Sequence, residues 1–174
     1  MTTNAEIKRR YAWLLMAAEN VKYVLWRPLV WKMAESQTQP INASSFVKEG
    51  AEPSRVRLNS PSAWVADHSY PGPWLQIDLA KDAVVKKIAT QGKRGAYHWV
   101  KTYTFLSRAE GETDWVTYKE NDEVKVFQGN NDQKTVVSHV LLQHIRARFV
   151  RFWPKTWTNK YKAMRAELYG CFLQ

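Results

Sequence analysis

The amino-acid sequence predicts an all-β fold in which about eight short antiparallel strands form a sandwich or a barrel. Three observations support this prediction. Short segments with apolar residues at alternating positions recur from residue 41 onward, turn-forming residues separate them, and no amphipathic helical pattern lies between them. Aromatic residues, which favour strands, make up 13% of the chain. With 174 residues the chain can bury the core of one domain without metals or disulfides.

The individual strands are predicted from alternation along the chain. Residues 55–58 alternate between arginine and apolar residues. Residues 74–79 place Leu75, Ile77 and Leu79 on one face of a strand, so we expect these three side chains to be buried. Turns between strands are supplied by Asn-Asp and Gly-Asn-Asn-Asp sequences. The further predicted strands are residues 84–90, 99–107, 115–119, 124–128, 136–142, 147–153 and 164–170.

Residues 1–33 form a separate segment. Their apolar residues recur at helical spacing, and Pro28 would end such a helix. Basic residues 8–10 followed by a short apolar stretch also resemble a signal peptide. A packed helix, a weak signal sequence and a helix lying on a membrane surface all stay open. We expect a short helical segment here and a β domain over residues 34–174.

The formal net charge of +10 favours an acidic partner. Residues 143–165 carry seven arginines and lysines and no carboxylate, whereas residues 109–132 are rich in Asp and Glu. These charges either neutralise one another in the fold or form a dedicated basic patch. No recognised nucleic-acid motif surrounds the basic residues, so we expect no nucleic-acid partner.

No motif in the sequence predicts catalysis. The histidines lack metal-ligand spacing, a single cysteine cannot form a cysteine-rich zinc site, and there is no nucleophile elbow or phosphate loop. Glu110, Glu112 and Asp114 alternate as in a solvated hairpin tip, with a calcium loop or an acid–base pair as alternatives. We therefore predict a non-enzyme with no metal and no cofactor. No apolar run is long enough for a transmembrane helix.

Many short motifs occur together in the order that is typical of one known family. The segment Trp74-Leu-Gln-Ile-Asp-Leu79 is close to the most recognisable strand of that family. Over about residues 27–171 the chain resembles the discoidin domain, also called the coagulation factor V/VIII C-type domain. The other matching elements are residues 27–29, 42–45, 57–59, 63–64, 89–92, 100–103, Trp115, 126–130, 147–151, 154–157 and 165–171.

The resemblance implies an eight-stranded antiparallel jelly-roll-like sandwich whose loops at one end bind ligands. By position, these spike loops are residues 45–54, 65–73 and 92–99. Family members usually join the two ends of the domain by a disulfide. This chain departs from that pattern, because Cys171 is present but the opening position holds no cysteine. We therefore predict a free thiol at Cys171 and a lower stability than that of the relatives.

The third spike loop is the leading candidate site. Lys93 and Arg94 would attract anionic headgroups or sulfates. Tyr97, His98 and Trp99 would supply contact with a membrane interface or a sugar ring. This arrangement resembles the phosphatidylserine-binding loops of some family members. In the alternative interpretation, Tyr97 and Trp99 begin a strand and face the core.

The other two spike loops offer fewer candidates. Phe46 and Val47 are the apolar side chains of the first loop that could insert into a membrane. Asp67 and Tyr70 in the second loop are similar to an acidic loop with which neuropilin-type members hold a basic peptide, since a carboxylate suits an arginine guanidinium. The hydroxyl donors expected for a peptide carboxylate are missing from the third loop.

We therefore predict a non-catalytic, extracellular recognition or cell-adhesion module. It would bind an anionic phospholipid or an acidic glycan through its spike loops, with peripheral membrane contact and no transmembrane segment. The alternatives are a neuropilin-like module that binds a protein partner at a cell surface and a lectin-like domain that targets carbohydrate.

Overall fold

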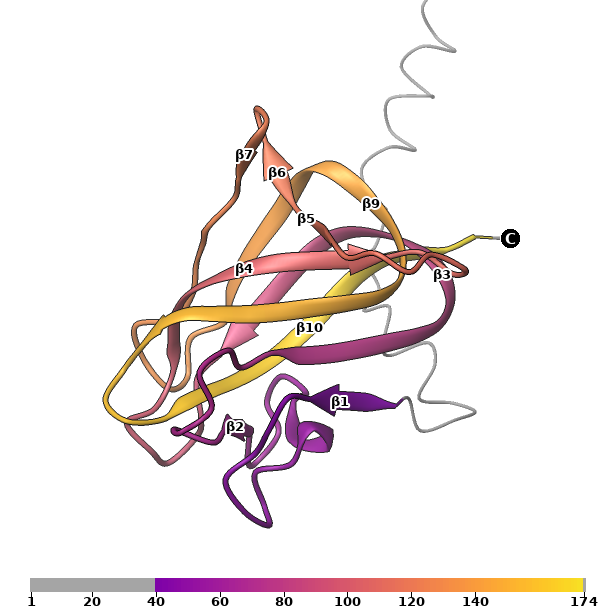
Figure 1. Cartoon of the computed structure of the whole chain (residues 1–174). Coiled ribbons are helices and arrows are strands. Elements are labelled where there is room, and N and C mark those ends of the chain that lie inside the picture. The colour runs from indigo at the N-terminus through magenta and orange to yellow at the C-terminus, as the bar shows by residue number, and fades with distance from the viewer. Residues whose placement is uncertain (1–39, 174) are drawn as a thin grey trace, which may run out of the picture.

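The computed structural model describes residues 40–173, so the predicted N-terminal helical segment lies outside the described residues. The regular secondary structure of the described chain is almost entirely strand, and the strands pair in an antiparallel manner, as predicted (Figure 1). Ten strands and one 3-10 helix follow one another: β1 (Ile41–Ala43), η1 (Pro53–Arg55), β2 (Trp64–Ala66), β3 (Leu75–Gln91), β4 (Val100–Arg108), β5 (Val116–Thr117), β6 (Lys119–Glu120), β7 (Glu123–Val124), β8 (Phe127–Gln128), β9 (Val137–Trp157) and β10 (Lys162–Phe172).

Two long strands, β3 and β9, run through both layers of the sandwich. In the first layer, residues 75–78 of β3 lie between β1 and the second half of β9, which pairs in turn with β4. In the second layer, residues 83–91 of β3 lie between the first half of β9 and β10, and β10 pairs with β2. The bend in β3 falls at Ala80, which has a positive φ of 65°. The carboxylate of Asp78 accepts a hydrogen bond from the Ala80 amide at 2.8 Å and stabilises this bend.

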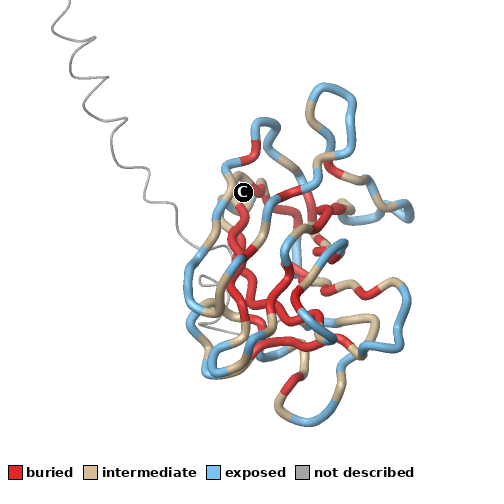
Figure 2. The backbone as a smooth tube through the Cα atoms, turned by 90° about the vertical axis from the view of Figure 1, so that its left-hand side faces the viewer, coloured by how far each residue is buried: buried red, intermediate tan, exposed pale blue. Residues whose placement is uncertain are grey.

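The core lies between the two layers, and Figure 2 shows the buried residues gathered on the strands in the middle of the domain. Leu75, Ile77 and Leu79 have exposed fractions of 0, 1 and 0%, which confirms the prediction from alternation. Aromatic rings fill the centre: Tyr103 and Phe105 of β4 pack against Phe152 of β9. These rings pack the inward faces of β4 and β9 against each other.

Several predicted element boundaries were wrong. Residues 55–58 do not form a strand, because Pro53 begins the 3-10 helix η1 and a turn follows it. The segments predicted as 74–79 and 84–90 are one bent strand, and so are those predicted as 136–142 and 147–153. Alternation reports which face a side chain occupies, and it cannot distinguish a bend within a strand from a break between two strands.

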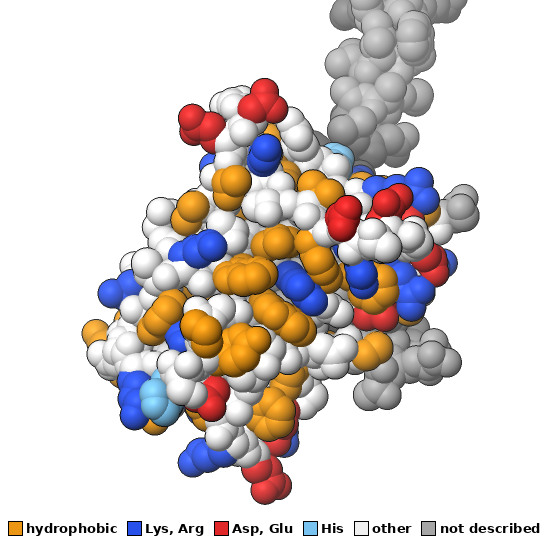
Figure 3. Space-filling model, in the orientation of Figure 1, with side chains coloured by type: hydrophobic (Ala, Val, Ile, Leu, Met, Phe, Trp, Pro, Cys, Tyr) orange, Lys and Arg blue, Asp and Glu red, His pale blue; other side chains and the backbone are white. Residues whose placement is uncertain are grey.

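The basic segment 143–165 is only partly neutralised in the fold. Arg146 and Arg148 form ion pairs with carboxylates, whereas Arg151 has none within 4 Å among the described residues. Figure 3 shows Lys and Arg side chains distributed over the visible face between apolar side chains. The basic residues are therefore neither fully neutralised in the fold nor gathered in one dedicated patch. They are spread out, and some form ion pairs whereas Arg151 forms none within the described chain.

A buried carboxylate on β10 has an unusual pKa. Glu167 is 5% exposed, and its Oε2 accepts a hydrogen bond from Nε of Arg57 at 3.1 Å. Its Oε1 is buried without a hydrogen-bond partner among the described residues. Burial raises the pKa of Glu167 to about 6, and the charge of Arg57 offsets only part of that rise.

This pKa predicts a pH dependence of folding stability. Because the native pKa of Glu167 lies above the ordinary value of 4.5, the native state binds this proton more tightly than the unfolded state. The resulting stability is fully present below pH 4.5 and is lost as the pH rises through about 6. Glu167→Gln should remove this loss, on the order of 2 kcal/mol. Urea unfolding at pH 4.5 and pH 7.5 measures it.

Glu112→Gln provides the control, because it removes one negative charge from an exposed residue. If the stability difference between Glu167→Gln and the unaltered protein stays constant across this pH range, the assignment of the titrating group to Glu167 is wrong.

Candidate ligand-binding site

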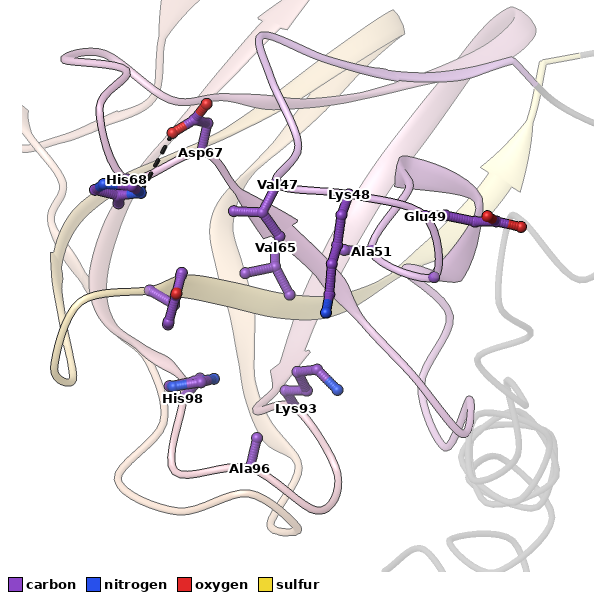
Figure 4. A pocket seen from close by; sticks show the side chains of 12 residues that line it. Val47, Lys48, Glu49, Ala51, Val65, Asp67, His68, Lys93, Ala96 and His98 are labelled. Atoms are coloured by element: carbon purple, nitrogen blue, oxygen red, sulfur yellow. Dashed lines mark ion pairs between the residues drawn. The ribbon is translucent and has the colours of Figure 1, made fainter.

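The three predicted spike loops lie side by side at one end of the domain. Together with Tyr161, from the turn between β9 and β10, they enclose a cavity of about 650 Å³. In Figure 4, side chains of the first two loops face those of the third loop across the cavity, and Glu49 points away from its centre. The residues that line the cavity are Val47, Lys48, Glu49, Gly50, Ala51, Val65, Asp67, His68, Lys93, Ala96, His98 and Tyr161.

The base of the cavity is apolar. The amide of Val47 donates to the carbonyl of Val65 at 3.0 Å, and the amide of Val65 donates to the carbonyl of Ala51 at 3.1 Å. These bonds attach the first loop to β2. Ala51, Val65 and Ala163 form a small buried cluster against which Val47 and Tyr161 pack. A ligand that enters here meets apolar side chains at the base and charged side chains at the rim.

The second loop holds its carboxylate in the ionised form. Asp67 accepts hydrogen bonds from the amide and the hydroxyl of Ser69 at 2.9 and 2.8 Å. These bonds lower the pKa of Asp67, with smaller contributions from His68 and Lys162. Lys162 lies beneath the loop, and its buried Nζ donates to the carbonyls of His68 and Tyr70 at 3.2 and 3.1 Å. Burial lowers the pKa of Lys162, because the charged ammonium group that holds the loop is partly removed from water.

The third loop closes on itself and presents one aromatic ring to solvent. The amide of Lys93 donates to the carbonyl of His98 at 3.0 Å. His98 packs edge-on against Tyr161 with ring centroids 4.8 Å apart, and burial, together with the charge of Lys93, lowers its pKa. Tyr97 is 61% exposed and packs edge-on against Trp99, which is only 4% exposed.

A second cavity, of about 700 Å³, lies beside Tyr97. Its lining includes the exposed amide residues Gln128, Asn131 and Asn159. Amide groups next to an aromatic ring are the kind of surface that hydrogen-bonds and stacks on a sugar.

Comparison with known proteins identifies the family. The family model described as the F5/8 type C domain matches residues 40–168. The chain belongs to this family. It is 37% identical to coagulation factor V of Bos taurus over 155 residues, and 34% identical to contactin-associated protein 1 of Homo sapiens over 132 residues. These matches cover 83% and 75% of the chain, but only 7% and 10% of the two relatives.

Solved structures confirm the fold. Discoidin II of Dictyostelium discoideum superposes with a TM-score of 0.74 at 17% identity, over 86% of this chain and 60% of that one. A family 32 carbohydrate-binding module from C. perfringens NanJ, in complex with galactose, has a TM-score of 0.62 at 15% identity, over 75% of this chain and 93% of that one. F5/8 type C domains are binding modules for lipids, glycans or proteins and are generally non-catalytic.

Most of the predicted site residues of this F5/8 type C domain lie at the loop end. Among the large hydrophobic side chains exposed in residues 40–173, the aromatic ones are Phe46, Tyr70 and Tyr97, with exposed fractions of 47, 41 and 61%. One comes from each spike loop. Arg94 is exposed, and the half-buried site residues are Val47, Asp67, Lys93 and His98.

Trp99 needs a correction to its expected role. Its ring is buried beneath Tyr97, so it supports the loop instead of offering a contact surface. Tyr161 and Lys162 were not predicted as site residues; they come from the turn and strand that follow β9. No spacing rule connects these residues to loops that precede them by more than 60 positions. The only sequence signal was that Lys162 belongs to the basic segment 143–165.

Gly92 begins the third loop, and a backbone conformation reserved for glycine is not the reason. It is not among the glycines with positive φ. The constraint is close packing: a Cβ at this position would lie 2.5 Å from the carbonyl oxygen of Asp132 and 3.0 Å from Cα of Gln133. The carbonyl of Gly92 also accepts a hydrogen bond from Nε of Arg165 at 2.7 Å.

Gly92→Ala should therefore destabilise the domain, because backbone atoms must move to admit the methyl group. We expect a loss of about 1–3 kcal/mol, which thermal unfolding would register as a lowered melting temperature. Gly72→Ala is the matched control, since its Cβ would meet only the Trp153 side chain at an ordinary 3.5 Å. Equal melting temperatures for the two variants would contradict this explanation of Gly92.

Proposed function

We propose that this domain is an extracellular recognition module that binds anionic phospholipid surfaces through its three spike loops. The observation that carries the proposal is the placement of Phe46, Tyr70 and Tyr97, one exposed aromatic side chain on each loop at the same end of the domain. Aromatic side chains on neighbouring loops can enter the interfacial region of a membrane together, and Tyr is favoured at that depth. An extracellular destination fits the names of its relatives, which include a coagulation factor.

Basic residues around the spike loops would also attract an anionic membrane to this surface. Lys48 and Lys93 line the cavity between the loops, and Arg94 lies exposed beside them. Glu49 and Asp67 counter part of this charge locally, but the chain as a whole carries a formal charge of +10. Each basic residue near an anionic surface contributes about 1 kcal/mol to binding. The charges would therefore bring the domain to the membrane, and the aromatic tips would hold it there.

A glycan is the second candidate ligand, and the amide-lined cavity beside Tyr97 favours it. Structures of the same fold include a module in complex with galactose and chitosan-binding modules. A sugar would stack on the Tyr97 ring and bond to amides such as Asn131. The two candidates share Tyr97 but differ in their need for Asn131.

The lipid proposal predicts that the aromatic contact and the electrostatic attraction contribute to vesicle binding with different salt dependences. Tyr97→Ala should weaken binding to vesicles of phosphatidylcholine and phosphatidylserine about tenfold at both low and high salt, because burial of an aromatic ring owes little to screening. The double variant Lys93→Ala/Arg94→Ala should weaken binding most at low salt, since exposed charges are screened over about 8 Å at physiological ionic strength. Sedimentation with vesicles measures both effects.

Leu142→Ala is the control, because this side chain on β9 is 76% exposed and lies outside the spike loops. Equal binding to vesicles without phosphatidylserine, or a Tyr97→Ala variant with unchanged affinity, would refute the lipid proposal. Saturable binding of galactose or chitotriose that Asn131→Ala abolishes would instead support the glycan.

A further inference from the structure

The outward face of the first layer is aromatic and basic instead of polar. On β9, Phe149, Arg151 and Trp153 alternate with the buried Val150 and Phe152. The register places these three residues opposite Arg108, Leu106 and Thr104 of β4. Figure 3 shows apolar side chains gathered around basic ones over the part of the molecule that contains β4 and β9. A solvated sheet face ordinarily carries polar residues.

Two arginines on this face lie among aromatic rings. The guanidinium of Arg151 is 4.0 Å from the ring centroids of both Trp74 and Trp115. The guanidinium of Arg108 is 5.1 Å from the Trp115 ring and 4.5 Å from the Phe149 ring. Both arginines and all three rings are half-buried. We call these five residues the Arg–Trp face.

The two arginines are not neutralised within residues 40–173. Arg146 and Arg148 lie nearby in the sequence. Arg146 forms an ion pair with Asp82 at 2.8 Å, and Arg148 forms ion pairs with Asp78 at 3.1 Å and Glu110 at 2.7 Å. By contrast, no carboxylate of the described residues lies within 4 Å of Arg108 or Arg151.

Their hydrogen-bonding capacity is also largely unused. Nε of Arg151 donates to the amide oxygen of Gln76 at 3.0 Å, and Nε of Arg108 is buried without a hydrogen-bond partner in the described chain. Burial lowers the pKa of Arg151, and the neighbouring charge of Arg108 lowers it further. Two like charges therefore share a partly dehydrated surface with donors to spare, and a carboxylate brought to them would relieve their repulsion.

We propose that the Arg–Trp face binds a protein partner whose contact segment carries carboxylates between apolar side chains. Each guanidinium can donate two parallel hydrogen bonds to a carboxylate, and aliphatic or proline side chains of the partner would cover the Trp74 and Trp115 rings. Trp and Arg are the residue types that dominate the energetic centres of protein interfaces. The rings of this face pack along the sheet instead of projecting as loop tips do, so they suit a complementary surface better than insertion into a bilayer.

This binding site is separate from the one proposed for lipid. None of its five residues lies in the spike loops or lines the cavity between them. Failure of Tyr97→Ala to weaken vesicle binding would therefore leave the Arg–Trp face unaffected, and failure of the present test would leave the lipid proposal standing.

The test is a titration of the full chain, labelled with ¹⁵N, with a soluble twelve-residue peptide that repeats Glu-Pro-Leu. We expect saturable shifts of the indole signals of Trp74 and Trp115 and of the Nε–H signals of Arg108 and Arg151. The same peptide with Gln in place of Glu should produce no saturable shifts, because it cannot pair with the guanidinium groups. Absence of shifts with the Glu peptide at millimolar concentration would overturn the proposal.

Substitutions of the two arginines test whether the planar guanidinium group is needed for binding. Arg151→Lys keeps the charge but loses the planar group that stacks and bonds in parallel, so affinity for the Glu peptide should fall about fivefold. Arg108→Lys serves as a second variant if Arg151→Lys fails to fold. The matched control is Arg146→Lys, whose side chain is 69% exposed and already paired with Asp82, and it should leave affinity unchanged.

Two further probes decide between classes of partner. A heparin-derived hexasaccharide that shifts the same four signals and binds more tightly than the Glu peptide would overturn the protein partner in favour of a glycan. Vesicles containing phosphatidylserine that broaden these signals in the Tyr97→Ala variant would overturn it in favour of a membrane. Equal loss of peptide affinity in Arg146→Lys and Arg151→Lys would show a non-specific charge effect and would also overturn the proposal.

Discussion

The guanidinium of Arg165 on β10 lies beneath the loop end of the domain and donates hydrogen bonds to three backbone carbonyls. These belong to Gly92, Ser60 and Gln133, at 2.7, 2.8 and 2.9 Å, in three segments far apart in the sequence. Arg165 is only 2% exposed, and burial, together with the charge of Arg94, lowers its pKa. Burying a guanidinium without a carboxylate is costly, so each of these hydrogen bonds has to be kept. The three segments are thereby held in one arrangement.

Strand β10 carries the other charged supports of the same region. Lys162 bonds to carbonyls of the second spike loop, and Glu167 bonds to Arg57 in the segment that precedes β2. All three charged side chains of β10 are buried and act on backbone or side chains of loops, while the strand itself is fixed by its pairing with β3 and β2. A regular sheet thus positions irregular loops, which is how loops can present exposed side chains in a defined arrangement.

Sequence reasoning recovered the fold because the alternation of Leu75, Ile77 and Leu79 reports a buried face directly. The family resemblance located the three loops that meet around the cavity. It did not separate Tyr97 from Trp99, because an aromatic side chain at the start of a strand fits either the core or the surface. It also missed the role of Arg165. Nothing in the sequence distinguishes a buried arginine from an exposed one, and the hydrogen-bond partners of Arg165 lie 32 to 105 positions away.

The central claim is that one buried arginine fixes the loop end, and amide hydrogen exchange of Arg165→Lys tests it most directly. Lysine keeps the charge, but its donors all sit on one nitrogen, which cannot reach the three carbonyls that Arg165 meets with three separate nitrogens. The account predicts faster exchange together in the segments around residues 60, 92 and 133, while the β3–β9 core keeps its protection and Arg146→Lys behaves like the unaltered protein. Unchanged exchange in the three segments, or an equal loss of protection throughout the domain, would contradict it.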